Sequence, residues 1–363
     1  MIQISSPELP ELEDYTAYLE DIWESKMLSN FGHYAECFED QIKRISGARY
    51  CSVVSSCDVG LIITLKAFDL KRGSEVLVPS FTFNSTGNAL LWNNLKPRFV
   101  DIRIADLNLD LEDLKSKINK KTSAILATNT FGIPSDLKEL EEIAKEHSIP
   151  LIFDSAQAFG SLYNERPIAK YGDAHVFSFA GTKIVTSGEG GAVVTPHKDI
   201  DEKVRYIRGY GFRKDYNGKY LGINGKISEL NAALGLLNID HVYDNIDKRS
   251  VLYNHYRALL TRNQLYHFPQ IGDHTATYPY FTLVFKYPKD SIKVEKRLYK
   301  HGVQTKRYYL PLHKTSMFRK FHKGHLYMTD WIYSRILNLP NHTGMEANDV
   351  EYICNTIRGV LNG

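Results

Sequence analysis

The chain has few cysteines and no excess of charge of either sign. Its 363 residues carry a formal net charge of +3 with 24% charged residues, a balance that excludes non-specific nucleic-acid binding over the whole surface. A chain of this length needs no disulfides, and its cysteines lack the close pairs of zinc sites. We therefore expect no metal site and reduced thiols in a cytoplasmic protein, at positions Cys37, Cys51, Cys57 and Cys354.

Long apolar runs are also missing. Nowhere do about 20 apolar residues follow one another, as a membrane-spanning helix requires. The opening stretch "MIQISSPELPELEDY" does not have the basic and then apolar pattern of a secretion signal. We expect no membrane span and no secretion, and we find no internal repeat or low-complexity segment.

What the sequence does contain is a regular alternation of apolar strands and amphipathic helices between residues 49 and 195. With 43% hydrophobic residues the chain can bury a large core. The alternation predicts an α/β fold with a mostly parallel sheet, whose sites lie at the carboxyl ends of the strands. The expected strands are "RYCSVV", "EVLVPS", "PRFVDI", "SAILAT", "IPLIFD", "AHVFSF" and "GAVVT".

Two further features predict the domain organisation. Helices expected at 11–26 and 34–46 precede the first strand and pack across the domain or against a partner chain. After about residue 245 the alternation becomes looser and ends in a helix near "ANDVEYICNTIRGVL". We predict a large domain at 1–245 and a smaller C-terminal α+β domain at 246–363.

A lysine occupies an unusual position in "HVFSFAGTKIVTSGEGGAVV". Most lysines are solvated surface charges, but Lys183 follows a strand that ends at Ser178 and precedes the glycine-rich "SGEGG". Glycines allow the backbone to approach closely there. A lysine in such a turn can form a Schiff base with a carbonyl cofactor such as pyridoxal phosphate. That cofactor also requires an acid at its pyridine nitrogen.

The acid stands in "PLIFDSAQAFGS". Asp154 ends an apolar strand, so its carboxylate is expected to face the crevice and hold the pyridinium proton. Gln157, three residues later, can donate its amide to the phenolic oxygen of the cofactor. Taken alone, Asp154 is equally well explained as a helix cap and Gln157 as an ordinary polar residue, so the hypothesis depends on their combination with Lys183.

Several longer segments resemble the DegT/DnrJ/EryC/StrS family of pyridoxal-phosphate-dependent sugar aminotransferases. The resemblance covers nearly the whole chain and implies the aspartate-aminotransferase fold, also called fold type I. It places the catalytic lysine on Lys183, the pyridine-nitrogen partner on Asp154, the phenolic-oxygen partner on Gln157, and a phosphate ligand on Ser178. The segments include "VPSFTFNSTGNALLW", "DSAQAFG", "FSFAGTK", "GINGKISELNAALG" and "RYYLPLH".

Other cofactor contacts follow from the same resemblance. Phe83 matches an aromatic residue that stacks on the pyridine ring, although a core phenylalanine is the alternative. Asn224 matches an asparagine that reaches the phosphate from the neighbouring subunit, which implies a homodimer with shared active sites. The segment "VSSCDVGL" departs from the family pattern. There the backbone amides of Cys57 and Asp58 are expected to bind phosphate, provided that the Asp58 carboxylate points away.

The sugar substrate is expected to meet a locally basic segment. Residues 286–323 contain nine lysines and three arginines against two acidic residues, a charge that suits a pyrophosphate, although a solvated basic face explains it equally well. Within "KRYYLPLHK" we predict Arg307, Tyr309 and His313 as substrate ligands. A second candidate is "RGYGFRKDYNGKY", with Arg208, Arg213 and Lys214.

The resemblance implies amino transfer from L-glutamate to a nucleotide-linked keto-sugar. The opening segment through "LSNFGHY" is more similar to the 4-aminotransferases of the family, which predicts C4 of dTDP-4-keto-6-deoxy-D-glucose as acceptor, for a bacterial surface glycan such as an O-antigen. A 3-aminotransferase acting on a dTDP-3-keto-6-deoxyhexose and a non-catalytic regulator remain alternatives. Lysine at position 183, where related 3-dehydratases carry histidine, favours transamination. A cysteine desulfurase is disfavoured because Phe83 takes the stacking position and no cysteine lies in a suitable loop.

Overall fold

The computed structural model describes residues 1–212, 216–261 and 266–361. The expected strands all form, because each is a short apolar run that the fold buries on both faces. The strands are β1 (Tyr50–Val54), β2 (Glu75–Pro79), β3 (Lys96–Val100), β4 (Thr122–Thr128), β5 (Leu151–Asp154), β6 (Leu162–Tyr163), β7 (Arg166–Pro167), β8 (Ala174–Ser178), β9 (Gly191–Thr195), β10 (Tyr266–His267), β11 (Tyr280–Phe285) and β12 (Ile336–Pro340).

The helices confirm the predicted alternation. The α-helices are α1 (Leu12–Ser25), α2 (His33–Ser46), α3 (Cys57–Ala67), α4 (Asn84–Trp92), α5 (Leu111–Lys117), α6 (Leu137–Glu146), α7 (Lys198–Ile207), α8 (Glu229–Ile239), α9 (Val242–Leu259), α10 (Pro288–Lys300), α11 (Tyr327–Tyr333) and α12 (Ala347–Leu361). Short 3-10 turns are η1 (Thr130–Gly132), η2 (Ile168–Lys170), η3 (Leu312–Lys314) and η4 (Arg319–Phe321). Among the helices of the described residues, none combines the length and the apolar character that a membrane span requires.

The central sheet has seven strands in the order β1-β9-β8-β5-β4-β2-β3. β9 runs antiparallel to both of its neighbours, and the pairs from β8 to β3 are parallel. Side chains alternate between two cores along each strand: Ile125 and Ala127 of β4 join one core, and Ala124 and Leu126 join the other. Helices therefore cover both faces, which confirms the predicted α/β fold with a mostly parallel sheet.

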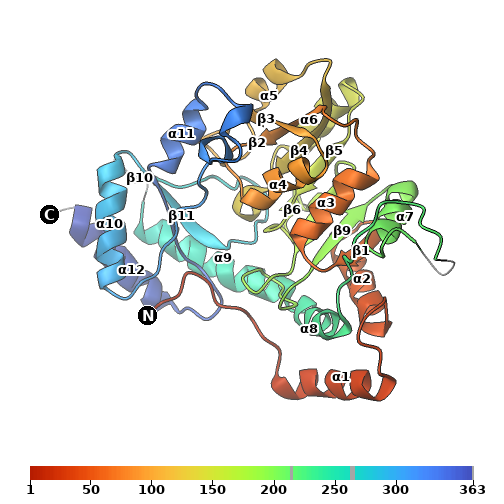
Figure 1. Cartoon of the computed structure of the whole chain (residues 1–363). Helices are drawn as coiled ribbons and strands as arrows, with labels where there is room; N and C mark the ends of the chain where they lie inside the picture. Colours follow the sequence, from red (N-terminus) through yellow and green to blue (C-terminus); the bar gives the residue numbers. More distant parts are fainter. Residues whose placement is uncertain (213–215, 262–265, 362–363) are drawn as a thin grey trace.

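A smaller antiparallel sheet, in the order β10-β11-β12, forms the C-terminal part. One of its faces packs on α9, α10 and α12 in a third core. Its other face meets the segments that follow β2 and β4, through Phe81, Phe131, Tyr280 and Ile336. Figure 1 shows the two sheets side by side, with α10 and α12 at the outer edge of the smaller one.

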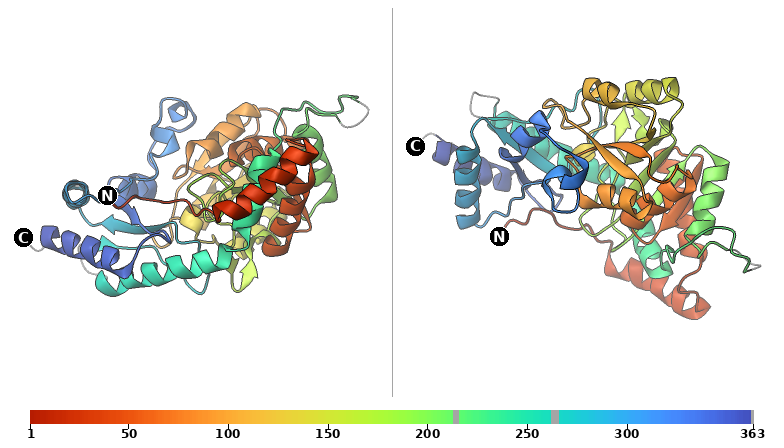
Figure 2. Two further views of the ribbon diagram at one scale, coloured as in Figure 1. Left: turned by 90° about the horizontal axis from the view of Figure 1, so that it is seen from below. Right: turned by 45° about the horizontal axis from the view of Figure 1, so that its top comes forward.

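Helix α9 connects the two parts of the molecule. Its first turns bury Val242 and Ile246 in the large core, whereas Tyr253 and Tyr256 belong to the core of the small sheet. Figure 1 shows α9 running from the C-terminal part toward α8 of the large part, and the left view in Figure 2 shows the same helix from below. The predicted boundary after residue 245 falls inside this helix, and Ile2 pairs with Val303, so the chain start packs against the C-terminal part. The exact division at 245 and 246 stays a prediction.

Candidate active site

A cavity of about 350 Å³ opens where the parallel strands end. Its walls come from the segments that follow β2, β4, β5 and β8, from the start of α3, and from Tyr280, Tyr308 and Tyr309 of the C-terminal part. Parallel α/β sheets place their sites at this edge because all the connecting loops meet there. The cavity therefore lies where the sequence predicted a site, and it brings side chains from both parts of the molecule together.

Lys183 enters this cavity from the turn after β8. Backbone hydrogen bonds fix the turn, from the amide of Lys183 to Ala180 (2.9 Å) and from the amide of Ser187 to Phe179 (2.8 Å). The residue is partly exposed, but its amine lies deep in the cavity, where loss of hydration lowers its pKa below the ordinary value of 10.5. No carboxylate of the described residues forms an ion pair with it. Burial thus shifts the amine toward its neutral, nucleophilic form.

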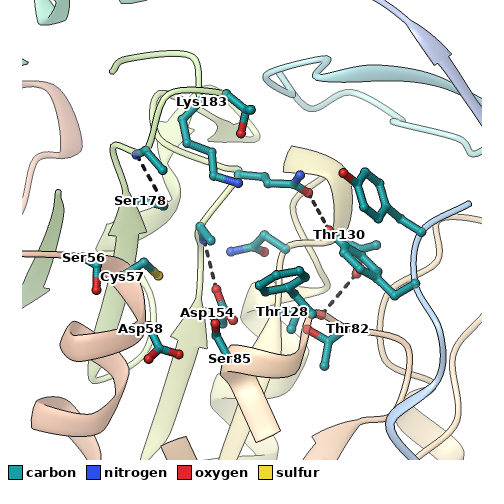
Figure 3. Close-up of a pocket in the computed structure, with 18 of the residues that line it drawn as sticks. Ser56, Cys57, Asp58, Thr82, Ser85, Thr128, Thr130, Asp154, Ser178 and Lys183 are labelled. Atoms are coloured by element: carbon teal, nitrogen blue, oxygen red, sulfur yellow. Dashed lines mark hydrogen bonds between the residues drawn. The ribbon is translucent and has the colours of Figure 1, made fainter. Parts of the chain in front are cut away.

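Asp154 lies on the floor of the same cavity. It is the last residue of β5 and only 8% exposed. The Thr86 hydroxyl donates to Oδ2 at 2.6 Å, and the Ala156 amide donates to Oδ1 at 3.1 Å. Burial raises the pKa of Asp154, although both hydrogen bonds and the charge of Lys183 oppose the increase. Figure 3 shows Asp154 below the amine of Lys183.

Gln157 and Tyr309 join the two parts of the molecule across the cavity. The Tyr309 hydroxyl donates to Oε1 of Gln157 at 3.0 Å. The Tyr309 ring stacks on Phe131, with centroids 5.4 Å apart. Phe83 also lines the cavity, with its ring edge-to-face to that of Tyr309 at 6.4 Å between centroids. It is 59% exposed, so its ring has surface free for a planar ligand. The structure thus brings Phe83, Gln157 and Tyr309, all predicted from sequence, to one cavity.

The start of α3 forms a further wall. The Ser56 hydroxyl caps the helix by accepting from the Val59 amide at 3.2 Å, which leaves the amides of Cys57 and Asp58 in the unpaired first turn. Ser178, buried at the end of β8, also lines the cavity. Figure 3 shows the Asp58 carboxylate near the floor, on the Asp154 side. The condition that it points away from a bound phosphate stays a prediction.

Three predicted residues lie away from the cavity wall. Asn224 is exposed and its Oδ1 accepts from Lys226 at 2.8 Å. Arg307 is held by Glu295 (2.8 Å) and by Ser291 (3.1 Å). His313 is buried between Ser80 (2.7 Å) and Asp330 (3.0 Å). Within this chain the structure does not bring these three to the site.

The second basic segment proposed to bind the substrate, "RGYGFRKDYNGKY", has one described candidate residue, and the structure does not support a substrate role for it. Arg208 is buried, where Nη1 donates to Glu39 at 2.6 Å and to the carbonyl of Val53 at 2.5 Å. It therefore joins α7 and α2 to β1 and does not face a substrate. Arg213 and Lys214 lie outside the described residues.

Sequence reasoning missed several residues of the wall and its support. Thr82, Ser85, Thr128 and Thr130 give the cavity hydroxyl groups, and Thr86 holds Asp154. A signal existed, because "SFTFNST" and "TNT" directly follow predicted strands. Hydroxyl residues are also common in ordinary loops and helix caps, so these positions did not stand out.

The donor set fits pyridoxal phosphate. A desolvated amine, a buried carboxylate and an exposed aromatic face surround one cavity. The unpaired amides at the start of α3, together with Ser178, offer hydrogen-bond donors for an anion. These groups correspond to the carbonyl, the ring nitrogen, the ring face and the phosphate of that cofactor.

The chain matches known proteins over almost its whole length. The model of the DegT/DnrJ/EryC1/StrS aminotransferase family matches residues 11–358. A dTDP-4-amino-4,6-dideoxy-D-glucose transaminase of Shigella dysenteriae is 29% identical over 99% of both chains. A dTDP-3-amino-3,6-dideoxy-alpha-D-galactopyranose transaminase of Aneurinibacillus thermoaerophilus is 27% identical over 90% of both. A structure of DesI in the presence of its TDP-sugar product has 29% identity and a TM-score of 0.91, over 98% of this chain and 91% of that one.

Proposed function

Because the chain belongs to the DegT/DnrJ/EryC1/StrS aminotransferase family, we propose that it transfers an amino group from L-glutamate to C4 of dTDP-4-keto-6-deoxy-D-glucose. The coarser assignment is established: the chain is a pyridoxal-phosphate-dependent aminotransferase of nucleotide sugars with the fold of that family. The observation that carries the chemistry is the desolvated amine of Lys183 above the buried carboxylate of Asp154.

Lys183 is proposed to anchor the cofactor and to move the proton in each half of the reaction. When bound, pyridoxal phosphate supplies a carbonyl group that condenses with amines and a ring that withdraws electrons from the carbon they carry. Burial lowers the pKa of Lys183, so its free amine is neutral over more of the pH range and can take a proton from the α-carbon of the donor. The same amine returns a proton when the keto-sugar receives the amino group.

The other residues of the cavity are proposed to hold and orient the cofactor. Asp154, fixed by Thr86 and Ala156, is proposed to keep a proton on the ring nitrogen. Gln157 is held by Tyr309 and is proposed to donate its amide to the phenolic oxygen. Phe83 offers its exposed ring as a stacking surface. Ser178 and the amides of Cys57 and Asp58 are proposed to hold the phosphate.

The choice of C4 is supported by the relatives. Two proteins named as dTDP-4-amino-4,6-dideoxy-D-glucose transaminase are 29% identical over 99% of this chain. The 3-amino-sugar transaminase is 27% identical over 90%, so a 3-aminotransferase is the second candidate. Tyr309 lies at the cavity and is kept as a sugar ligand, whereas Arg307 and His313 require a rearrangement to reach one.

We propose a homodimer in which Asn224 completes the phosphate site of the partner. Asn224 is exposed and does not line the cavity of its own chain. Large apolar side chains are exposed elsewhere on the chain, among them Leu12 and Trp23 of α1 and Leu221, which supports a surface covered by a partner. A reducing compartment is proposed as well, because all four cysteines are described and free. The product is proposed to enter a surface glycan such as an O-antigen.

The deciding experiment is an assay of the purified protein with pyridoxal phosphate, glutamate and a panel of 3-keto and 4-keto nucleotide sugars. We expect the amino group at C4 of the dTDP-linked 4-keto sugar, identified by mass and NMR. Lys183→Ala should abolish turnover while the folded protein still retains the cofactor without a covalent bond. Turnover of only the 3-keto isomer would reject the proposed position, and normal turnover by Lys183→Ala would reject the role of the lysine.

A further inference from the structure

One buried arginine of α9 has no partner in the described part of the chain. Arg249 is 3% exposed, yet its guanidinium forms no hydrogen bond and no ion pair with any described residue, and its Nε is buried without an acceptor. Arg208 is equally buried but pairs with Glu39 at 2.6 Å. The Nε of Arg208 also lacks an acceptor, so the two residues differ in their charge: that of Arg208 has a carboxylate partner, and that of Arg249 has none among the described residues.

The position of Arg249 relates it to the active site. It lines a second, small pocket of about 10 Å³, here called the extension, that Thr277 and Pro279 also line. Lys183 and Gln157 line both this extension and the main cavity. The charge of Arg249 also acts on the hydroxyl of Tyr280, another residue of the cavity wall. Arg249 therefore shares a pocket wall with two of the residues proposed to act on the substrate and cofactor.

An unpaired buried cation is unfavourable for folding. Removing a guanidinium from water without a compensating partner is strongly destabilising, and burial lowers the pKa of Arg249 to about 10, which still leaves it charged near neutral pH. Arg249 occupies a core-facing position, in helical spacing with Ile246 and Tyr253. The charge of Glu8 raises the pKa of Arg249, but the two side chains do not form an ion pair. A cation kept in such a place indicates an anionic partner that arrives from outside the chain.

We propose that Arg249 binds the α-carboxylate of the amino-acid donor. This inference rests on the proposed function, because that reaction brings an amino acid to Lys183. The carboxylate and the amine of an amino acid share one carbon, so a donor whose amine lies beside Lys183 has its carboxylate a few ångströms away. The extension has room for a group the size of one water, which a single carboxylate oxygen matches, and a guanidinium is suited to carboxylate geometry.

The first test measures binding rather than turnover. Glutarate has the carboxylates of the donor but no amine, and it is titrated into the wild-type holoenzyme and into Arg249→Gln by calorimetry. We expect the glutarate dissociation constant to increase about 10- to 100-fold in Arg249→Gln, as for loss of a charge-assisted hydrogen bond. Lys248→Gln removes a charge at the neighbouring exposed position of α9 and serves as the control, with no change expected.

The second test separates the two halves of the reaction. In Arg249→Gln the glutamate-dependent half should slow about 10- to 100-fold at low glutamate, whereas the aminated holoenzyme should react with keto-sugar within twofold of the wild-type rate. The affinity for pyridoxal phosphate should remain within twofold as well. A loss of pyridoxal phosphate affinity with unchanged glutarate affinity would overturn the proposal and assign Arg249 to the cofactor phosphate.

A second variant keeps the test decisive if Arg249→Gln does not fold. Arg249→Lys keeps the charge but loses the planar guanidinium and its additional donors, so we expect weaker glutarate binding than in the wild type. If Arg249→Gln does not fold, unchanged glutarate affinity in Arg249→Lys overturns the proposal. The glutarate result does not depend on the sugar substrate. If the wild-type protein aminates no sugar in the panel, the proposed substrate is rejected. Glutarate binding that depends on Arg249 would still support this inference.

Discussion

Replacing Thr86 by valine should impair catalysis without disturbing the fold. The Thr86 hydroxyl donates to Asp154 at 2.6 Å and lies 2.7 Å from the Thr82 hydroxyl. Because the single proton of Thr86 goes to Asp154, Thr82 must donate to Thr86. Valine has nearly the same shape as threonine but leaves one oxygen of a buried carboxylate without this donor.

The magnitude follows from the hydrogen bond that is lost. A bond to a buried charged group contributes about 1.5–3 kcal/mol, which corresponds to a decrease of about 10- to 100-fold in kcat/KM if the ionised form of Asp154 is the active one. The sign is set by the charge: the Thr86 hydroxyl stabilises the carboxylate, so its removal raises the pKa of Asp154 further. The acidic limb of the kcat/KM profile should therefore move to higher pH.

Steady-state kinetics of three variants over a pH series test this prediction. Thr86→Ser retains a hydroxyl and should stay close to the wild type. Thr82→Val removes only the second donor of the relay and should have a smaller effect than Thr86→Val. A wild-type rate and pH profile in Thr86→Val would refute the argument that this hydroxyl controls Asp154.

Three further predictions concern stability and cofactor retention. Lys183→Met should stabilise the cofactor-free protein at pH 7, because the lowered pKa of Lys183 means that the unfolded wild-type chain binds more protons than the folded one. The urea midpoints of wild type and variant should converge as pH approaches 10.5. A variant less stable than the wild type at pH 7 would contradict this. His175 is buried with a pKa of about 4 against 6.5 when unfolded, so about 3 kcal/mol of unfolding free energy should be lost as pH falls through that window. His175→Gln should flatten the loss and the exposed His147→Gln should not; equal slopes in both would refute it. Asn224→Ala should weaken retention of pyridoxal phosphate with little change in Tm, and unchanged retention would leave it a turn residue.

The sheet was predictable because its strands are buried on both faces. Such strands appear in the sequence as short continuous apolar runs, and β1, β4 and β8 form within a residue or two of the expected positions. The two-residue strands β6, β7 and β10 carry no such pattern. The division into domains was harder to place, because α9 contributes one stripe of side chains to both cores and shows no break in its sequence.

The site was predictable where a residue follows a strand. Asp154 ends β5 and Lys183 follows β8, and the fold carries both to the same edge of the sheet. A basic composition, by contrast, does not indicate which way each basic side chain points. Arg307 belongs to the basic segment 286–323, yet its guanidinium turns to Glu295, and no property of the sequence distinguishes this orientation from one toward a substrate.

Buried charges in this molecule are of two kinds, and the difference separates structure from function. Glu39, Arg205 and Arg208 form ion pairs with one another and with Asp201, so their charges are balanced within the chain and need no ligand, although the Nε of Arg208 has no acceptor. Lys183 and Arg249 have no such counterpart among the described residues, although burial lowers the pKa of both. Both line the extension, and Lys183 lines the main cavity as well. Because the unfavourable burial of each is relieved by a carbonyl or carboxylate ligand, binding of those ligands and stability of the fold should increase together.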